Sequence, residues 1–126
     1  MKLRMRSNSI RLRLTQSEVG QLAKNGIVEE TIDFGSAFGG RFIYSLQIDR
    51  DRQDVYSTSG SGRINVHVPR TLAENWIQTE EVGIEGLQPT DSGRSLRLII
   101  EKDFTCLHPR PGEDRSDAFP NPSAEK

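Results

Sequence analysis

The chain has 126 residues, a length that fits one domain with a single hydrophobic core. Leu, Ile, Val and Phe make up about a quarter of it, above the level of about one fifth below which chains are usually disordered. The 17 basic and 18 acidic side chains leave a formal charge of −1, so no strong overall field draws the molecule to nucleic acid or acidic lipid.

Cysteine content and hydropathy bear on the compartment. A single Cys excludes an internal disulfide, and no apolar run approaches the roughly 20 residues that a membrane-spanning helix needs. The first residues, MKLRMR, lack the apolar segment of a secretion signal. We therefore expect a cytoplasmic protein without a membrane partner.

Two alternating segments near the amino terminus predict a β-hairpin. Residues 2–6 and 9–14 alternate between polar and apolar side chains, the period of half-buried strands. A two-residue turn at Ser7 and Asn8 sets a register in which residues whose numbers add to fifteen face each other. Four cations then share one face of the hairpin: Lys2, Arg4, Arg11 and Arg13.

The following residues predict two short helices among further strands. Thr15 and Glu18 have the spacing of a capping box, which starts a helix over 16–25 that ends at Gly26. A second helix carries an apolar stripe that includes Leu72 and Trp76. Further strands are expected over residues 27–34, 42–48, 55–59, 64–68, 81–86 and 95–104.

These elements predict one α+β domain over residues 1–104, with a mostly antiparallel sheet or partly closed barrel of about seven to eight strands and two short helices. A shift of 54 residues places 10–14 on 64–68 and one helix on the other. A strand–helix–strand duplication is one interpretation of this match. Chance is the other, because alternating apolar residues are common in strands.

Residues 105–126 predict an extended or disordered Pro-rich tail, because they lack periodic apolar residues and hold four of the six prolines. Phe119 is the one large apolar group in the last stretch, beside Pro120 and close to Pro122. We expect this group to anchor the tail in a groove of its own domain or of a partner.

The basic face of the hairpin is the first candidate site. Like charges directly opposed across two strands are destabilising, so something should neutralise them. One interpretation is an adjacent strand that carries Glu29 and Asp33. The other is a site for an anionic partner, because clustered Arg suits phosphate recognition. Nucleic acid is disfavoured as that partner, since no aromatic side chain lies between these cations to stack on a base.

The second candidate site is a transition-metal site at Cys106 and His108, with Asp103 nearby. One Cys and two His cannot complete a Cys/His tetrad, so such a site needs carboxylates or a second chain. Cys106 with His67 or His108 also offers a nucleophile and a base, but nothing in the sequence places them together. We therefore assign no catalytic residue.

Three segments resemble a family of small bacterial proteins of unknown function. They are KLRMRSNSIRLRLTQSEV at 2–19, EKDFTC at 101–106 and DAFPNP at 117–122. The resemblance implies a free-standing bacterial cytosolic domain, and it brings no established activity, substrate or catalytic residue.

The favoured hypothesis is a non-enzymatic binding or interaction module without a cofactor. It would engage an unknown protein or anionic partner through the basic hairpin face or the tail. The alternative is a metal-binding protein or metal-dependent enzyme centred on Cys106 and His108. We also consider a homodimer, because open antiparallel sheets leave unpaired edges.

Overall fold

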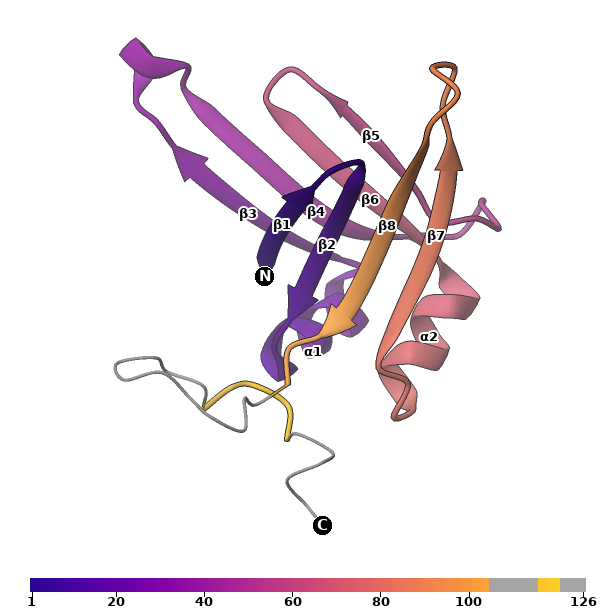
Figure 1. Cartoon of the computed structure of the whole chain (residues 1–126). Coiled ribbons are helices and arrows are strands. Elements are labelled where there is room, and N and C mark those ends of the chain that lie inside the picture. Colours follow the sequence, from indigo (N-terminus) through magenta and orange to yellow (C-terminus); the bar gives the residue numbers. More distant parts are fainter. Residues whose placement is uncertain (105–115, 121–126) are drawn as a thin grey trace.

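Two four-stranded sheets face each other, and two helices lie at one end of them (Figure 1). The computed structural model describes residues 1–104 and 116–120. Sheet A has the order β1-β2-β8-β7 and comprises β1 Lys2–Arg6, β2 Ser9–Leu14, β7 Gly83–Pro89 and β8 Ser95–Lys102. Sheet B has the order β3-β4-β6-β5 and comprises β3 Ile27–Asp33, β4 Arg41–Asp49, β5 Tyr56–Gly60 and β6 Arg63–Pro69. The helices are α1 Gln16–Asn25 and α2 Arg70–Gln78, with a short 3-10 turn at Ser36–Phe38.

The prediction of an α+β domain with about seven to eight strands and two short helices is confirmed: there are eight strands in residues 1–104, and they form two separate sheets. No closed barrel is formed by residues 1–104 and 116–120. Hairpin neighbours pair antiparallel, but the two central pairs, β2 with β8 and β4 with β6, are parallel. Parallel neighbours need a long crossover, and here the chain between them passes through the other sheet.

The amino-terminal hairpin has the predicted register. Arg4 lies opposite Arg11, and Lys2 lies opposite Arg13. Ser7 takes a left-handed conformation with φ 52°, which a two-residue hairpin turn requires. The cations of β1 and β2 therefore do share one face, as the alternation indicates.

An internal repeat is complete at the level of elements. Each strand or helix of the first half has a counterpart close to 54 residues later: β1 and β5, β2 and β6, α1 and α2, β3 and β7, β4 and β8. The repeated unit is thus hairpin, helix, hairpin, which is longer than the strand–helix–strand unit expected from the sequence. Each sheet combines the first hairpin of one unit with the second hairpin of the other.

The core lies between the two sheets and the helices. Leu12 and Leu98 of sheet A, Leu46 of sheet B and Trp76 of α2 are almost fully buried. The indole Nε1 of Trp76 donates to the carbonyl of Val82 at 3.1 Å. Burial of these side chains provides the main stabilising contribution, and the hydrogen bond satisfies the one polar atom of the indole.

Residues 116–120 pack against the same chain. Phe119 therefore anchors this segment on its own domain, which is one of the two alternatives expected for the tail. The amide of Phe119 donates to the carbonyl of Asp103 at 2.7 Å, and its ring lies 5.9 Å from that of Phe104. The amide of Gln16 donates to the carbonyl of Asp117 at 3.0 Å. This segment therefore joins the end of β8 to the start of α1.

Neither of the two helices that the structure describes has the length and apolar character required to cross a membrane.

Candidate anion-binding face of sheet A

Five cations lie on the outer face of β1 and β2, which we call the arginine face. Leu12 and Leu14 point into the core, so the residues that alternate with them on β2 point outward. The register of β1 then brings its own cations to the same side. The arginine face consists of Lys2, Arg4, Arg6, Arg11 and Arg13.

Carboxylates at the end of sheet A neutralise part of this charge. Oε1 of Glu101, on β8, accepts from Nε of Arg13 at 2.6 Å and from Nη1 of Arg11 at 3.3 Å. Oδ2 of the buried Asp103 lies 3.1 Å from Nζ of Lys2. The parallel pairing of β2 with β8 places Glu101 directly beside Arg13.

The expectation that Glu29 and Asp33 neutralise the hairpin within the chain is wrong. Both lie on β3, which belongs to sheet B, because the chain crosses to the other sheet after α1. The arginine face instead forms its ion pairs with Glu101 and Asp103, which lie 88 to 101 positions away in the sequence. No local signal in residues 2–14 indicates that pairing.

Arg4 and Arg6 remain exposed, and no carboxylate of residues 1–104 or 116–120 forms an ion pair with either. Together with Ser9 and Arg11 they line a shallow recess of about 120 Å³. Guanidinium groups bind carboxylates and phosphates through paired, charge-assisted hydrogen bonds. The recess therefore presents unused donors that suit an anionic group.

The repeat offers an internal comparison for this face. The positions in β5 and β6 that correspond to the five cations hold no Lys or Arg. They are Tyr56, Thr58, Gly60, Asn65 and His67. Because the same hairpin forms there without this charge, the fold itself does not require a cluster of arginines.

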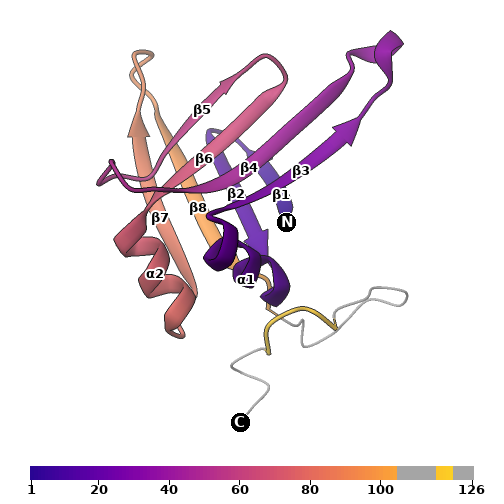
Figure 2. The ribbon, with the colours of Figure 1, turned by 180° about the vertical axis from the view of Figure 1, so that it is seen from behind.

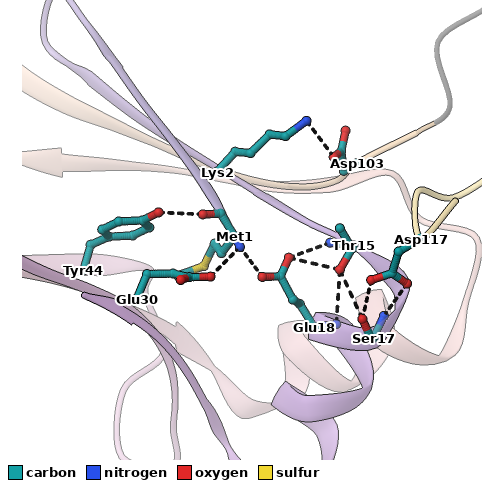
Figure 3. Close-up of polar contacts among 9 residues, drawn as sticks. All are labelled: Met1, Lys2, Thr15, Ser17, Glu18, Glu30, Tyr44, Asp103 and Asp117. Atoms are coloured by element: carbon teal, nitrogen blue, oxygen red, sulfur yellow. Dashed lines mark hydrogen bonds and ion pairs between the residues drawn. The ribbon is translucent and has the colours of Figure 1, made fainter. Parts of the chain in front are cut away.

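The amino-terminal residue fixes the start of β1 (Figure 3). The amino group of Met1 lies between the carboxylates of Glu18 and Glu30, at 2.8 Å from Oε1 of Glu30. The hydroxyl of Tyr44 donates to the carbonyl of Met1 at 2.6 Å. Burial alone would lower the pKa of this amino group, but its contacts with the two carboxylates outweigh burial and raise the pKa.

A polar cluster on sheet B corresponds to the arginine face. The imidazole of His67 stacks on Tyr56 at 4.4 Å, and its Nδ1 lies 3.9 Å from Oδ2 of Asp49. The guanidinium of Arg52 lies 4.1 Å above the Tyr56 ring. Burial lowers the pKa of His67, which favours the neutral imidazole.

A second recess, which the sequence did not reveal, lies between the ends of the two helices and the end of β4. It has a volume of about 510 Å³, and its lining includes Lys24, Arg50 and Arg70. Arg70 is already engaged by Glu74, with Nε and Oε1 at 2.8 Å. Lys24 lies in α1, Arg50 directly after β4 and Arg70 in α2, so no local sequence pattern could have grouped them.

The candidate metal site is only partly within the described residues, because Cys106 and His108 lie outside them. Pro122, which was expected to contact a partner together with Phe119, also lies outside them. Asp103 lies inside and forms the ion pair with Lys2. In residues 1–104 and 116–120, no group of three His, Cys, Asp or Glu side chains is arranged to hold a metal ion.

Comparison with known proteins supports the resemblance noted in the sequence. The profile of the family of unknown function DUF7009 matches residues 1–123. The chain belongs to this family. No curated protein and no solved structure gives a significant match to it.

Proposed function

We propose that this member of DUF7009 is a binding module in which strand β1 and the arginine face recognise an extended acidic segment of a partner protein. The observation that carries the proposal is the comparison within the repeat. The unit that forms β5 and β6 builds the same hairpin with a single Arg, Arg63, whereas β1 and β2 carry five cations. A charge cluster that the fold does not need is best explained by a ligand.

The form of the partner follows from the position of the cations on a sheet edge. Within the described residues β1 pairs with β2 alone, so the backbone groups on its other side are open to a further strand. An added strand would receive main-chain hydrogen bonds from β1, and its alternate side chains would lie beside Arg4 and Arg6. Acidic residues at every second position of that strand fit this spacing.

The proposal is tested with a fluorescent peptide that alternates Glu and Thr, and with the same peptide carrying Gln in place of Glu. We expect the chain to bind the Glu peptide and not the Gln peptide. Binding of the Glu peptide should weaken as the salt concentration increases. The double variant R4Q/R6Q should bind at least about tenfold more weakly, because it loses charge-assisted hydrogen bonds.

The matched control is K24Q/R50Q, which removes the same charge from exposed positions on α1 and just after β4. It should bind the Glu peptide as the unmodified chain does. Equal binding of the two peptides, or equal binding by R4Q/R6Q and the unmodified chain, would contradict the proposal.

A further inference from the structure

The two sheets are closed against each other on one side and open on the other. Strands β5 and β7 lie at one side of the molecule, and β1 and β3 at the opposite side (Figures 1 and 2). On the β5 side, Oε1 of Gln88 accepts from the amide of Ser57 at 2.6 Å, and Nε2 of Gln88 donates to the Ser57 carbonyl at 3.1 Å. One side chain thus joins the two edge strands.

The corresponding positions on the β1 side cannot form this connection. They are Leu3 and Ile32, both apolar, and Ile32 is exposed. The amino group of Met1 and Tyr44 hold the start of β1 near sheet B. Beyond that point the β3–β4 hairpin projects away from β1 (Figure 1). Strands β1 and β3 are thus edge strands of two different sheets, and we call the side of the molecule between them the gap.

Large apolar side chains are exposed at this gap. Ile32 pairs with Phe42 on the inner face of sheet B, and Met5 pairs with Ile10 on the inner face of sheet A. Three apolar residues at the gap have exposed fractions of 57% for Met5, 43% for Ile32 and 51% for Phe34. The second half of the repeat has polar residues at the corresponding positions: Ser59, Gln88 and Thr90. Apolar groups gathered this way indicate an interaction surface.

The two edges of the gap carry opposite charge on their outer faces. Arg4 and Arg6 lie on β1. Glu29 and Asp33 lie on β3, at positions that alternate with the buried Val28. Asp33 forms no ion pair within the part of the chain that the structure describes, and Glu29 contacts Arg63 in an exposed pair at 3.1 Å. Each edge is therefore complementary to the other.

We infer that a second copy of this chain occupies the gap, with β1 of each copy beside β3 of the other. The inference rests on the proposed function, because it names the acidic segment that the arginine face binds. A twofold axis along the gap makes the contact isologous: the same two edges meet twice, and the exposed apolar residues of both copies become buried between them. Each sheet continues across the interface into a sheet of the other copy.

Charge selects this arrangement over the other twofold contact. An axis perpendicular to the sheets would place β1 beside β1 and β3 beside β3. Arginines would then face arginines, and carboxylates would face carboxylates, which destabilises neighbouring strands. Pairing β1 of one copy with β3 of the other avoids both repulsions and gives Arg4 an acidic neighbour.

The test is the concentration-dependent mass of the full chain in sedimentation equilibrium. We expect twice the monomer mass at high concentration. The variants R4E and D33R should each dimerise at least tenfold more weakly, because both contacts in their homodimers join like charges. An equimolar mixture of R4E and D33R should recover dimerisation, since both contacts in the mixed dimer join opposite charges.

A variant at an exposed position away from the gap, R94E, serves as the control and should dimerise normally. The fluorescence of Trp76, which is buried in the core, reports that each variant is folded. Failure of the R4E and D33R mixture to recover the dimer would overturn the arrangement.

The same experiment separates this inference from the proposed function. A chain that stays monomeric at every concentration but binds the Glu peptide through Arg4 and Arg6 overturns the second copy as partner and leaves the proposed function standing. A chain that neither dimerises nor binds the peptide overturns both.

Discussion

Asp49 and Asp103 occupy equivalent places at the ends of the two sheets, and each carboxylate contacts the side chain of the first residue of an edge strand. Oδ2 of Asp49 accepts from the hydroxyl of Tyr56 at 2.7 Å, and Oδ2 of Asp103 lies 3.1 Å from Nζ of Lys2. Tyr56 begins β5 and Lys2 begins β1. Each half of the repeat thus has one carboxylate at this place. Its partner is a neutral hydroxyl in sheet B and a cation in sheet A, so the two faces differ in charge from this point on.

The polar cluster on sheet B predicts a pH dependence of stability. Burial lowers the pKa of His67 below its ordinary value of 6.5, Asp49 opposes this, and Arg52 adds to it. A base whose pKa is lower in the folded state is protonated more readily when unfolded. The free energy of unfolding should therefore fall as pH drops from about 6.5 through the lower folded value.

The measurement is an NMR titration of the two imidazoles, with His67→Asn to assign the His67 signal. The His67 midpoint should lie below that of a free histidine, and Asp49→Asn should lower it further by removing the carboxylate that raises it. A His67 midpoint above 6.5 would contradict the assigned environment.

The close approach of β7 to the residue before β5 predicts the effect of a glycine substitution. A Cβ atom at Gly86 would lie 2.8 Å from Cβ of the buried Val55. Gly86→Ala should lower the free energy of unfolding by about 1–3 kcal/mol, as overpacked cores do. Urea unfolding followed by Trp76 fluorescence measures this change.

Gly20→Ala is the matched control for that substitution. Gly20 lies in α1, is exposed and has no atom within 4 Å of the added Cβ. Here the substitution should raise the free energy of unfolding by about 0.5–1 kcal/mol, because Ala favours the helix. If both variants shifted stability in the same direction, the packing of Gly86 against Val55 would be wrong.

Contacts of the segment 116–120 predict that it contributes to stability. Phe119 packs against the core cluster, and Nζ of Lys102 lies 5.6 Å from its ring. Phe119→Ala should lower the free energy of unfolding by about 2 kcal/mol, less than for a fully buried Phe. Leu87→Ala, at an exposed position of β7, should change it by no more than about 0.5 kcal/mol. Equal effects in urea unfolding would show that Phe119 is not anchored.

Local patterns in the sequence predicted most elements and the faces of their strands. Alternation with a period of two assigned the outward cations of β1 and β2, and the two-residue turn fixed their register. The capping box at Thr15 and Glu18 placed the start of α1. These features depend on residues close together in the chain, so the sequence by itself determined them.

Only the tertiary structure decided which strands share a sheet. Strand β2 finds its second neighbour in β8, so Arg13 meets Glu101 and not the carboxylates of the next strand in sequence. The same exchange of hairpins leaves β1 and β3 as open edges on one side. Pairing between distant strands depends on the packing of all the apolar faces at once, and a period of two is the same whichever sheet a strand joins.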